Sequence, residues 1–510
     1  MAIPIELDKI QGNSFGGFNK DHQSNLFLKF TSAAAGRAWI AEVLEEISPS
    51  SDVLEFNNQF RALKKHGVKK PEALISAIWV NLALSFKGLQ ALNLKSADLA
   101  LFPDAFKNGM AAADIGDVGA SAPSKWIAPF NAPADVHALL IVAADHPHEL
   151  DAKVKDITGT AAFKAGVTLL HLEPGNTRSD QPGHEHFGFK DGVSQPGIRG
   201  IDKPDDPIGN PDQGHPGQDL LWPGEFVLGY ETQRDKADPN FDEPNPVAGP
   251  VSTSGPGWTK NGSYLVFRRL AQDVPAFKKA VHDLANTLGW SQDLTGAKLV
   301  GRYKSGCPIE QRKFQAGPYT PPSTDPGDPH HGNPALGNDN TLNNNFEYGD
   351  DPQGVNCPMS AHIRKAYPRD EPTPGGLPDG TNSESSTQTH RLLRRGIPFG
   401  ESFHPHVPGS DKVPRGLLFL AYQNDIAKHF EFVQKFWVNA ANFPPNPQGQ
   451  PPLKGAPGED PIIAQSPKGD MLIDPARNPV SVAHFVTTTG GEYFFSPSID
   501  TLDGIGKGTI

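Results

Sequence analysis

Apolar and polar positions along the first 175 residues follow two different periods, and together they predict a mixture of strands and helices. Alternating or continuous apolar runs predict strands at 26–30, 138–143 and 166–172. Apolar residues at helical spacing predict helices at 33–47, 71–94 and 149–157. Strands and helices mix without the regular repeat of a parallel βαβ fold, which favours an α+β class.

The pattern restarts in the second half of the chain. Residues 200–260 are rich in Pro, Gly and Asp, contain one strand-like run at 224–230, and indicate a soft domain boundary. Beyond them the apolar runs predict strands at 261–269, 415–422 and 491–495 and helices at 275–288 and 426–437. The second half thus resembles the first in its order of elements, although no sequence repeat is visible.

The helix at 426–437 carries an apolar stripe whose members are spaced i, i+4, i+7 and i+11: Ile426, Phe430, Val433 and Trp437. This spacing is typical of a helix face that packs on the core. An electron-relay role for Trp437 is the alternative. Residues 318–345 are poor in apolar side chains and predict a long surface loop, in which a metal site at His330-His331 is the alternative.

The composition is that of a globular protein, with 510 residues, 37% hydrophobic and 20% charged. The net charge of −12 argues against non-specific binding to nucleic acid or to anionic membranes. No apolar run reaches the roughly 20 residues that span a membrane. The first residues show no leader peptide, so we expect a cytoplasmic protein, with a secreted form that has lost its leader as the alternative. Two cysteines, Cys307 and Cys357, form no disulfide framework, and the sequence does not decide whether they pair.

The stretch 356–369 contains one histidine, His362, among three cations, Arg364, Lys365 and Arg369. A neutral imidazole nitrogen is a common metal ligand near neutral pH. The cations suit an anionic partner, such as a cofactor that carries carboxylates. A structural or solvated histidine is the alternative.

Two further stretches carry candidate chemistry. In 186–196, Gly188 and Gly192 bracket a short span that ends in Asp191, which could be a general acid/base or a metal ligand; a plain Asp-Gly turn is the alternative. In 390–400, Arg394 and Arg395 are adjacent between apolar residues. An inward-facing arginine requires an anionic partner or a reacting centre that develops negative charge, so a buried ion pair is the alternative to catalysis.

Together Asp191, His362 and Arg394 are the parts needed to break a peroxide O–O bond. A histidine ligates iron from one side. On the other side an aspartate moves the proton and an arginine stabilises the charge on the departing oxygen.

Three motifs in this order resemble those of the dye-decolorizing peroxidases: Gly188 to Gly192, Ala361 to Arg364, and Arg394 to Gly400. Shorter supporting similarities occur at 10–13, 223–230, 261–267, 301–303, 345–350, 416–420 and 460–463, so the resemblance covers most of the chain. The insertions at 200–260, 318–345 and 440–460 are similar to those of the longer branch, which has fungal and bacterial members.

The resemblance implies two ferredoxin-like α+β halves with antiparallel sheets and haem b bound mainly by the second. We place the halves at 1–245, which contributes the distal aspartate, and 246–510. His362 is then the proximal iron ligand, and Asp191 and Arg394 are distal, with Arg395 as the fallback for Arg394.

The resemblance also implies roles around these residues. Asp460 matches a carboxylate that accepts the proximal histidine N–H, with a turn before Pro461 as the alternative. Leu417 and Phe419 match positions that wall the distal pocket. Gly192 adjoins the cofactor, and Arg364 pairs with a haem propionate.

The activity implied is reduction of hydrogen peroxide to water through a ferryl porphyrin radical, with oxidation of dyes, phenols and related aromatic donors. Bulky donors imply an electron relay through a surface Tyr or Trp, and the carboxylate acid/base implies activity at acidic pH. Two alternatives remain: a haem-binding or iron-release protein with little turnover, and a binding protein without haem. A homo-oligomer is possible, and Mn(II) oxidation is undecided.

Overall fold

Nine strands form the main sheet of the protein. The structure is a computed structural model that describes residues 3–234, 247–310, 334–371, 384–447, 449–465 and 468–510. The strand order is β4-β1-β3-β2-β13-β7-β10-β8, with β9 also paired to β10, and every pair is antiparallel. The antiparallel α+β class predicted from the sequence is confirmed.

The first four strands come from the N-terminal part of the chain: β1 (His22–Phe30), β2 (Ile78–Leu84), β3 (Ala138–Ala144) and β4 (Val167–Asn176). Between them lie α2 (Ala33–Val43) and α3 (Ser50–Lys65), and then α7 (Pro147–Gly159) and α8 (Ala161–Gly166). The chain order β-α-β-β-α-β with the spatial order β4-β1-β3-β2 is the ferredoxin-like arrangement.

The C-terminal strands repeat this arrangement: β7 (Ser263–Gln272), β8 (Leu393–Arg394), β9 (Ile397–Phe399), β10 (Gly416–Gln423) and β13 (Val486–Ser496). The helices α9 (Val274–Leu288) and α10 (Gln292–Val300) follow β7, and two π-helical turns, Ala427–Glu431 and Val433–Val438, follow β10. The spatial order β13-β7-β10, with β8 and β9 outside β10, again places the last strand beside the first.

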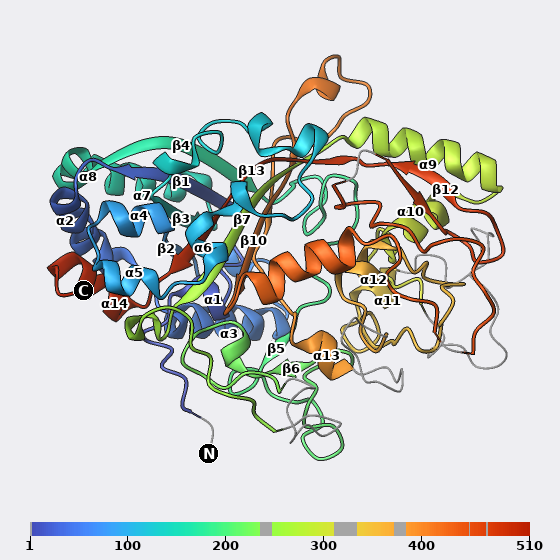
Figure 1. Ribbon diagram of the computed structural model, residues 1–510, viewed down its shortest axis with the longest axis horizontal. Coiled ribbons are helices and arrows are strands. Elements are labelled where there is room, and N and C mark those ends of the chain that lie inside the picture. Colours follow the sequence, from blue (N-terminus) through green and yellow to red (C-terminus); the bar gives the residue numbers. More distant parts are fainter. Residues whose placement is uncertain (1–2, 235–246, 311–333, 372–383, 448, 466–467) are drawn as a thin grey trace.

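The two sets of strands join where β13 pairs with β2, at Phe495 and Leu84. Figure 1 shows the N-terminal elements, in blue and cyan, on the left and the later helices α9 to α12 on the right, with β13, β7 and β10 running through the middle. The boundary expected between 245 and 246 lies outside the described residues, and the division at that point stays a prediction.

Shorter elements complete the fold. The helices are α1 (Gly12–Phe15), α4 (Phe86–Ala91), α5 (Ser96–Ala100), α6 (Asp104–Asn108), α11 (Pro334–Asn338), α12 (His362–Ala366), α13 (Glu384–Gln388) and α14 (Ile499–Lys507). The strand pairs are β5 (Gly197–Ile198) with β6 (Leu220–Leu221), and β11 (Lys468–Met471) with β12 (Val480–Ala483).

The central strands of the sheet are buried, and this burial explains why one helix was predicted wrongly. All seven residues of β3 are buried, as are the last five of β2. A strand covered on both faces shows no alternation of apolar and polar residues, so its apolar run is easily taken for a helix. The helix predicted at 71–94 is therefore wrong: a 3₁₀ turn, β2 and α4 occupy those residues, while α3 was missed.

The strand predicted at 224–230 is also wrong. A 3₁₀ turn at Pro223–Glu225 begins this segment, and Gly224 approaches other backbone so closely that a Cβ there would lie 2.1 Å from the carbonyl oxygen of Tyr230. The other predicted strands and helices are confirmed within a few residues, although the helix at 426–437 is π-helical.

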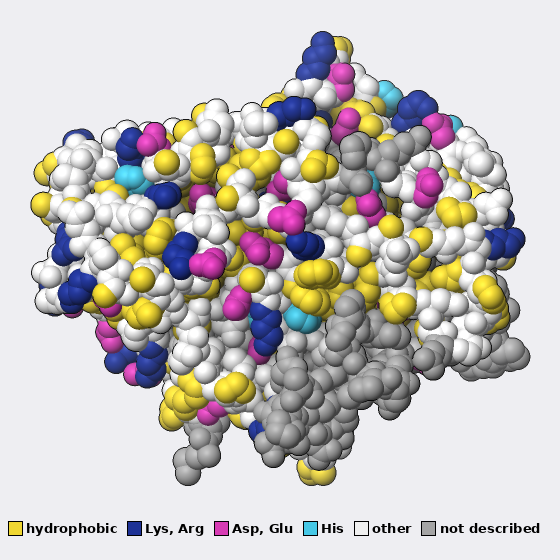
Figure 2. Space-filling view, in the orientation of Figure 1, with side chains coloured by type: hydrophobic (Ala, Val, Ile, Leu, Met, Phe, Trp, Pro, Cys, Tyr) yellow, Lys and Arg dark blue, Asp and Glu magenta, His cyan; other side chains and the backbone are white. Residues whose placement is uncertain are grey.

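Cys307 and Cys357 are buried free thiols. His330 and His331 lie outside the described residues. No helix in the described part of the chain combines the length and apolarity that crossing a membrane requires. On the face shown in Figure 2, basic and acidic side chains are interspersed among uncharged ones.

Candidate active site

A cavity brings together segments that lie far apart in the sequence. Its wall is formed by the loop 185–196, α10, α12 and the residues after it, residues 390–394, β10, and the π-helical turns that follow β10. Much of this wall is apolar: Phe187, Phe189, Leu270, Val300, Leu417, Phe419, Phe430, Val433, Val438, Ile462, Ile463 and Val486. Charged and polar side chains gather in a few places on it, so the cavity suits a large apolar ligand with a few polar groups.

Asp191 enters the cavity from a tight loop. Gly188 and Gly192 have φ angles of 96° and 72°, in the region that favours glycine. The Asp191 backbone N–H donates to Gly183, and its carboxylate accepts the Gly192 N–H at 2.6 Å. The segment is therefore a turn, as the simpler interpretation held, and this turn aims the carboxylate into the cavity.

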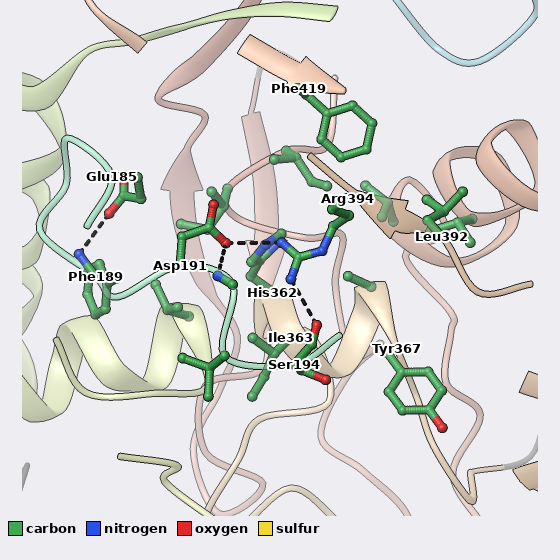
Figure 3. A pocket seen from close by; sticks show the side chains of 18 of the residues that line it. Glu185, Phe189, Asp191, Ser194, His362, Ile363, Tyr367, Leu392, Arg394 and Phe419 are labelled. Atoms are coloured by element: carbon green, nitrogen blue, oxygen red, sulfur yellow. Dashed lines mark hydrogen bonds and ion pairs between the residues drawn. The ribbon is translucent and has the colours of Figure 1, made fainter. Parts of the chain in front are cut away.

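Arg394 reaches the same carboxylate from β8. Its Nη1 lies 3.0 Å from Asp191 Oδ1, and its Nη2 donates to the carbonyl of Ser194 at 3.0 Å (Figure 3). Burial raises the pKa of Asp191, but the Arg394 charge and the hydrogen bond from Gly192 outweigh it and hold that pKa below its usual value. The aspartate is therefore ionised and paired with a cation.

Arg395 faces away from the cavity, and this distinguishes the two arginines. Its guanidinium donates to the carbonyls of Asn13 and Phe15 in α1, at 3.0 and 2.9 Å. Neighbouring residues of an extended chain face opposite sides, as the sequence predicts. Arg394 is the arginine that lines the cavity.

His362 is the first residue of α12 and lines the same cavity as Asp191 and Arg394. Its Nδ1 lies 2.8 Å from Oδ2 of the buried Asp460. The other Asp460 oxygen accepts the N–H groups of Ile462 and Ile463 at 2.7 and 3.1 Å. Asp460 is thus both the turn residue and the histidine partner that the sequence offered as alternatives.

The Asp460 pair determines which imidazole nitrogen is free. Burial raises the pKa of Asp460, but His362 and the N–H groups of Ile462 and Ile463 together outweigh burial and hold it below its usual value, so the carboxylate is ionised and Nδ1–H donates to it. Burial lowers the pKa of His362, but the charge of Asp460 and its hydrogen bond together outweigh burial and raise that pKa above its usual value. In the neutral ring, which is the form that ligates a metal, Nε2 is then the nitrogen with the available lone pair, and the carboxylate makes it a stronger donor to a metal.

The expectation that Arg364 binds a haem propionate is corrected by its surroundings. Arg364 is fully buried and does not line the cavity. It forms an ion pair with Glu371, and its Nη1 donates to the carbonyl of Cys357 at 2.7 Å. Arg364 lies two positions after His362, about 200° around α12, so it faces away from the cavity. Lys365 does not line the cavity either and donates to backbone carbonyls.

Arg369, the third cation of that stretch, does line the cavity, together with Arg302, which lies in the similarity at 301–303 but had no role assigned to it. Both guanidinium groups donate to the one side-chain oxygen of Asn344, at 2.7 and 2.9 Å. Burial and the nearby Arg369 lower the pKa of Arg302 to about 10. Arg369 Nη1 also lies 3.9 Å from Glu347 Oε1, so the described residues give these two buried cations one ion-pair partner and leave positive charge to be matched by a further anion.

The remaining predicted positions are placed as follows. Gly192, Leu417 and Phe419 all line the cavity. Of the predicted helix stripe, Phe430 and Val433 also line it, whereas Trp437 is fully buried and does not line it. The spacing of these apolar residues predicted a helix face that points into the protein. It could not show that part of this face borders a cavity.

The fold and the cavity together define a haem peroxidase: an imidazole nitrogen available to iron and an ionised Asp–Arg pair line one apolar cavity of a double ferredoxin-like sheet. Residues 9–179 match the model of the DyP dimeric alpha+beta barrel domain, and residues 379–443 match that of the Dyp-type peroxidase C-terminal region. The chain belongs to the dye-decolorizing peroxidase family and, like its members, is a haem enzyme.

Relatives match along nearly the whole chain. The dye-decolorizing peroxidase msp1 of Mycetinis scorodonius is 32% identical, over 98% of this chain and 87% of the relative. A solved ancestral D-type dye-decolorizing peroxidase has a TM-score of 0.76 and 33% identity, covering 98% of this chain and 99% of its own. A dye-decolorizing peroxidase solved in complex with 2,6-dimethoxyphenol has a TM-score of 0.74 and 30% identity, with 98% and 100% covered.

Proposed function

We propose that this peroxidase uses haem b, ligated by His362, to reduce hydrogen peroxide while it oxidises dyes and phenols. The observation that carries the proposal is that the Asp460–His362 pair and the Asp191–Arg394 pair line one cavity. When bound, haem supplies the iron that accepts electrons from donors and passes them to peroxide.

The chain's own residues handle the proton and the charge. Asp191 is ionised, so one carboxylate oxygen can take a proton from hydrogen peroxide and return it to the departing oxygen. Arg394 presents N–H groups beside that carboxylate, where they stabilise negative charge on the departing oxygen. Apolar side chains such as Leu417 and Phe419 exclude water from the same space.

Arg369 and Arg302 are the residues we propose for the haem carboxylates, in place of Arg364. Both line the cavity, and both are buried beside a shared neutral acceptor. A guanidinium matches the geometry of a carboxylate in a way that few other side chains do.

Two observations support dyes and phenols as the substrate class: the names of the relatives and the largely apolar lining of the cavity. Related proteins are named dye-decolorizing peroxidases, and one is solved with 2,6-dimethoxyphenol. The test is oxidation of 2,6-dimethoxyphenol by the purified, haem-loaded protein, with and without hydrogen peroxide. Turnover only with peroxide supports the proposal. Haem-loaded protein that instead releases iron and leaves the porphyrin intact would favour the iron-release alternative.

Replacing Arg394 with leucine should slow the reaction with hydrogen peroxide by at least the order of 10²–10³-fold that a preorganised charge donor contributes. The pH profile should change as well. The wild type needs ionised Asp191, so its rate is lost only as the pH falls below the usual carboxyl pKa, because that pKa is lowered. Without the Arg394 charge, burial raises the pKa, and the acidic limb should move to higher pH.

This prediction is measured by stopped-flow absorbance at a series of acidic pH values. Arg395→Leu is the comparison, because Arg395 adjoins Arg394 in sequence but donates to α1 carbonyls. An acidic limb that stays in place in Arg394→Leu would show that the two side chains do not interact as the geometry indicates.

Replacing Asp460 with asparagine should weaken the imidazole as a donor to iron. A neutral amide accepts the Nδ1–H less strongly than the carboxylate 2.8 Å away. We expect a loss of about 10–100-fold in haem affinity or activity, and a more positive iron reduction potential. Potentiometric titration followed by absorbance measures the potential, and a potential equal to that of the wild type would contradict the role of Asp460.

A further inference from the structure

Two tyrosines among the described residues line the cavity, and their hydroxyl groups differ sharply. The hydroxyl of Tyr348 is buried and has no hydrogen-bond partner among the described residues. The hydroxyl of Tyr367 contacts two carboxylates, Asp219 Oδ2 at 2.6 Å and Glu384 Oε1 at 2.9 Å. In Figure 3 the ring of Tyr367 borders the cavity and its hydroxyl points away from the Asp191–Arg394 pair.

Counting protons assigns a direction to these contacts. A phenol has one hydrogen and can donate to only one carboxylate, while an ionised carboxylate has none to give. One of the two acids must therefore be protonated and donate to the phenolic oxygen. Burial and the charges of Asp219 and Glu347 raise the pKa of Glu384 to about 9, so Glu384 carries that proton.

Asp219 is then the ionised acceptor. Its Oδ2 also accepts from Arg391 Nη1 at 2.6 Å, an ion pair that is buried on both sides. The result is a directed chain of hydrogen bonds, from Glu384 to Tyr367 to Asp219, held at its end by a cation. The phenol's proton thus has an anionic base at 2.6 Å.

The charge above the ring opposes electron loss unless the proton leaves too. The Arg391 guanidinium carbon lies 3.6 Å from the centre of the Tyr367 ring, and that of Arg369 lies 5.5 Å away. A cation over an aromatic face is attracted by its electrons and repelled by any positive charge on it. An oxidised Tyr367 ring is therefore stable here only as the neutral radical, after its proton has moved to Asp219.

We propose that Tyr367 is a redox-active residue of the cavity wall, which gives one electron to the oxidised cofactor and its phenolic proton to Asp219. The O–H bond of Tyr367 breaks and an O–H bond forms on Asp219. Tyr367 becomes a neutral radical and the cofactor gains one electron. An aromatic donor then gives Tyr367 one electron, and Asp219 returns the proton. This inference rests on the peroxidase function proposed above.

Freeze-quench EPR of the haem-loaded protein after one equivalent of hydrogen peroxide tests the inference. The wild type should show a tyrosyl radical, whose line shape changes when the protein contains ring-deuterated tyrosine. Tyr367→Phe should lose this signal, and Tyr348→Phe and Tyr493→Phe should keep it. Tyr493 is a matched control because its hydroxyl donates to Glu431 at 2.9 Å, yet Tyr493 does not line the cavity.

A tyrosyl signal of full size in Tyr367→Phe would overturn the assignment. Absorbance recorded on the same samples separates this failure from that of the proposed function. If the wild-type haem spectrum does not respond to peroxide, the peroxidase proposal and the inference are both wrong. If it responds while the radical is unaffected by Tyr367→Phe, only the inference is wrong.

Two further variants test the direction of proton transfer. Asp219→Asn removes the base, whereas Glu384→Gln keeps a neutral N–H donor to the phenolic oxygen. We expect Asp219→Asn to reduce the radical yield several-fold and Glu384→Gln to leave it close to wild type. The reverse order would show that Glu384 is the proton acceptor and that Asp219 is not.

Discussion

Replacing Asp191 with asparagine should slow the reaction with hydrogen peroxide by about 10²–10⁴-fold, the usual contribution of a positioned acid/base. The amide has nearly the shape of the carboxylate, so the loop and the cavity should persist. It cannot take a proton from peroxide, and it no longer forms an ion pair with Arg394 3.0 Å away. The rate is measured by stopped flow, from the change in haem absorbance after mixing with peroxide.

Asp180→Asn is the matched control for this variant. Asp180 lies in the same region of the chain, pairs with Arg178 at 2.7 Å and does not line the cavity. Its substitution should leave the rate close to wild type. If Asp191→Asn binds haem and reacts at the wild-type rate, Asp191 is not the acid/base and another group on the cavity wall moves the proton.

Replacing His362 with alanine should remove the iron ligand, and we expect the purified protein to hold little haem. The apolar wall and the arginines would still attract the porphyrin, so any haem that remains should have a changed Soret band. Asp460, which is fully buried, would also lose the partner of its Oδ2, an additional cost of about 1–3 kcal/mol or more. Haem content is measured from the ratio of Soret to protein absorbance.

His215→Ala is the control for general effects of removing a histidine. His215 is exposed, pairs with Asp205 at 2.7 Å and does not line the cavity. Exogenous imidazole should restore haem binding in His362→Ala and have no such effect on His215→Ala. An unchanged Soret band in His362→Ala would place the iron ligand elsewhere in the chain.

Much of this site could be predicted from the sequence because its residues lie in short motifs with distinctive local chemistry. Asp191 sits between two glycines with positive φ, and Arg394 is one of two adjacent arginines that an extended chain must point in opposite directions. His362 was the one histidine of a cationic stretch. For Asp191 and Arg394 the local alternatives, a turn and an ion pair, are part of the same arrangement.

Other features could not be predicted because they depend on contacts between distant segments. Whether Arg364 or Arg369 faces the cavity depends on where α12 ends and on Glu371, which pairs with Arg364. The bonds of Tyr367 join it to residues 148 and 17 positions away, and no local pattern reveals them. β2 was taken for a helix because burial on both faces removes its alternation.

The most direct test of the central claim is the absorption spectrum of the purified, haem-supplied protein before and after one equivalent of hydrogen peroxide. The account predicts a ferric Soret band that changes within milliseconds of mixing. A band that is present but inert would contradict the peroxidase function and leave haem binding alone. The absence of any Soret band after reconstitution with haem would contradict the assignment of His362 as the iron ligand.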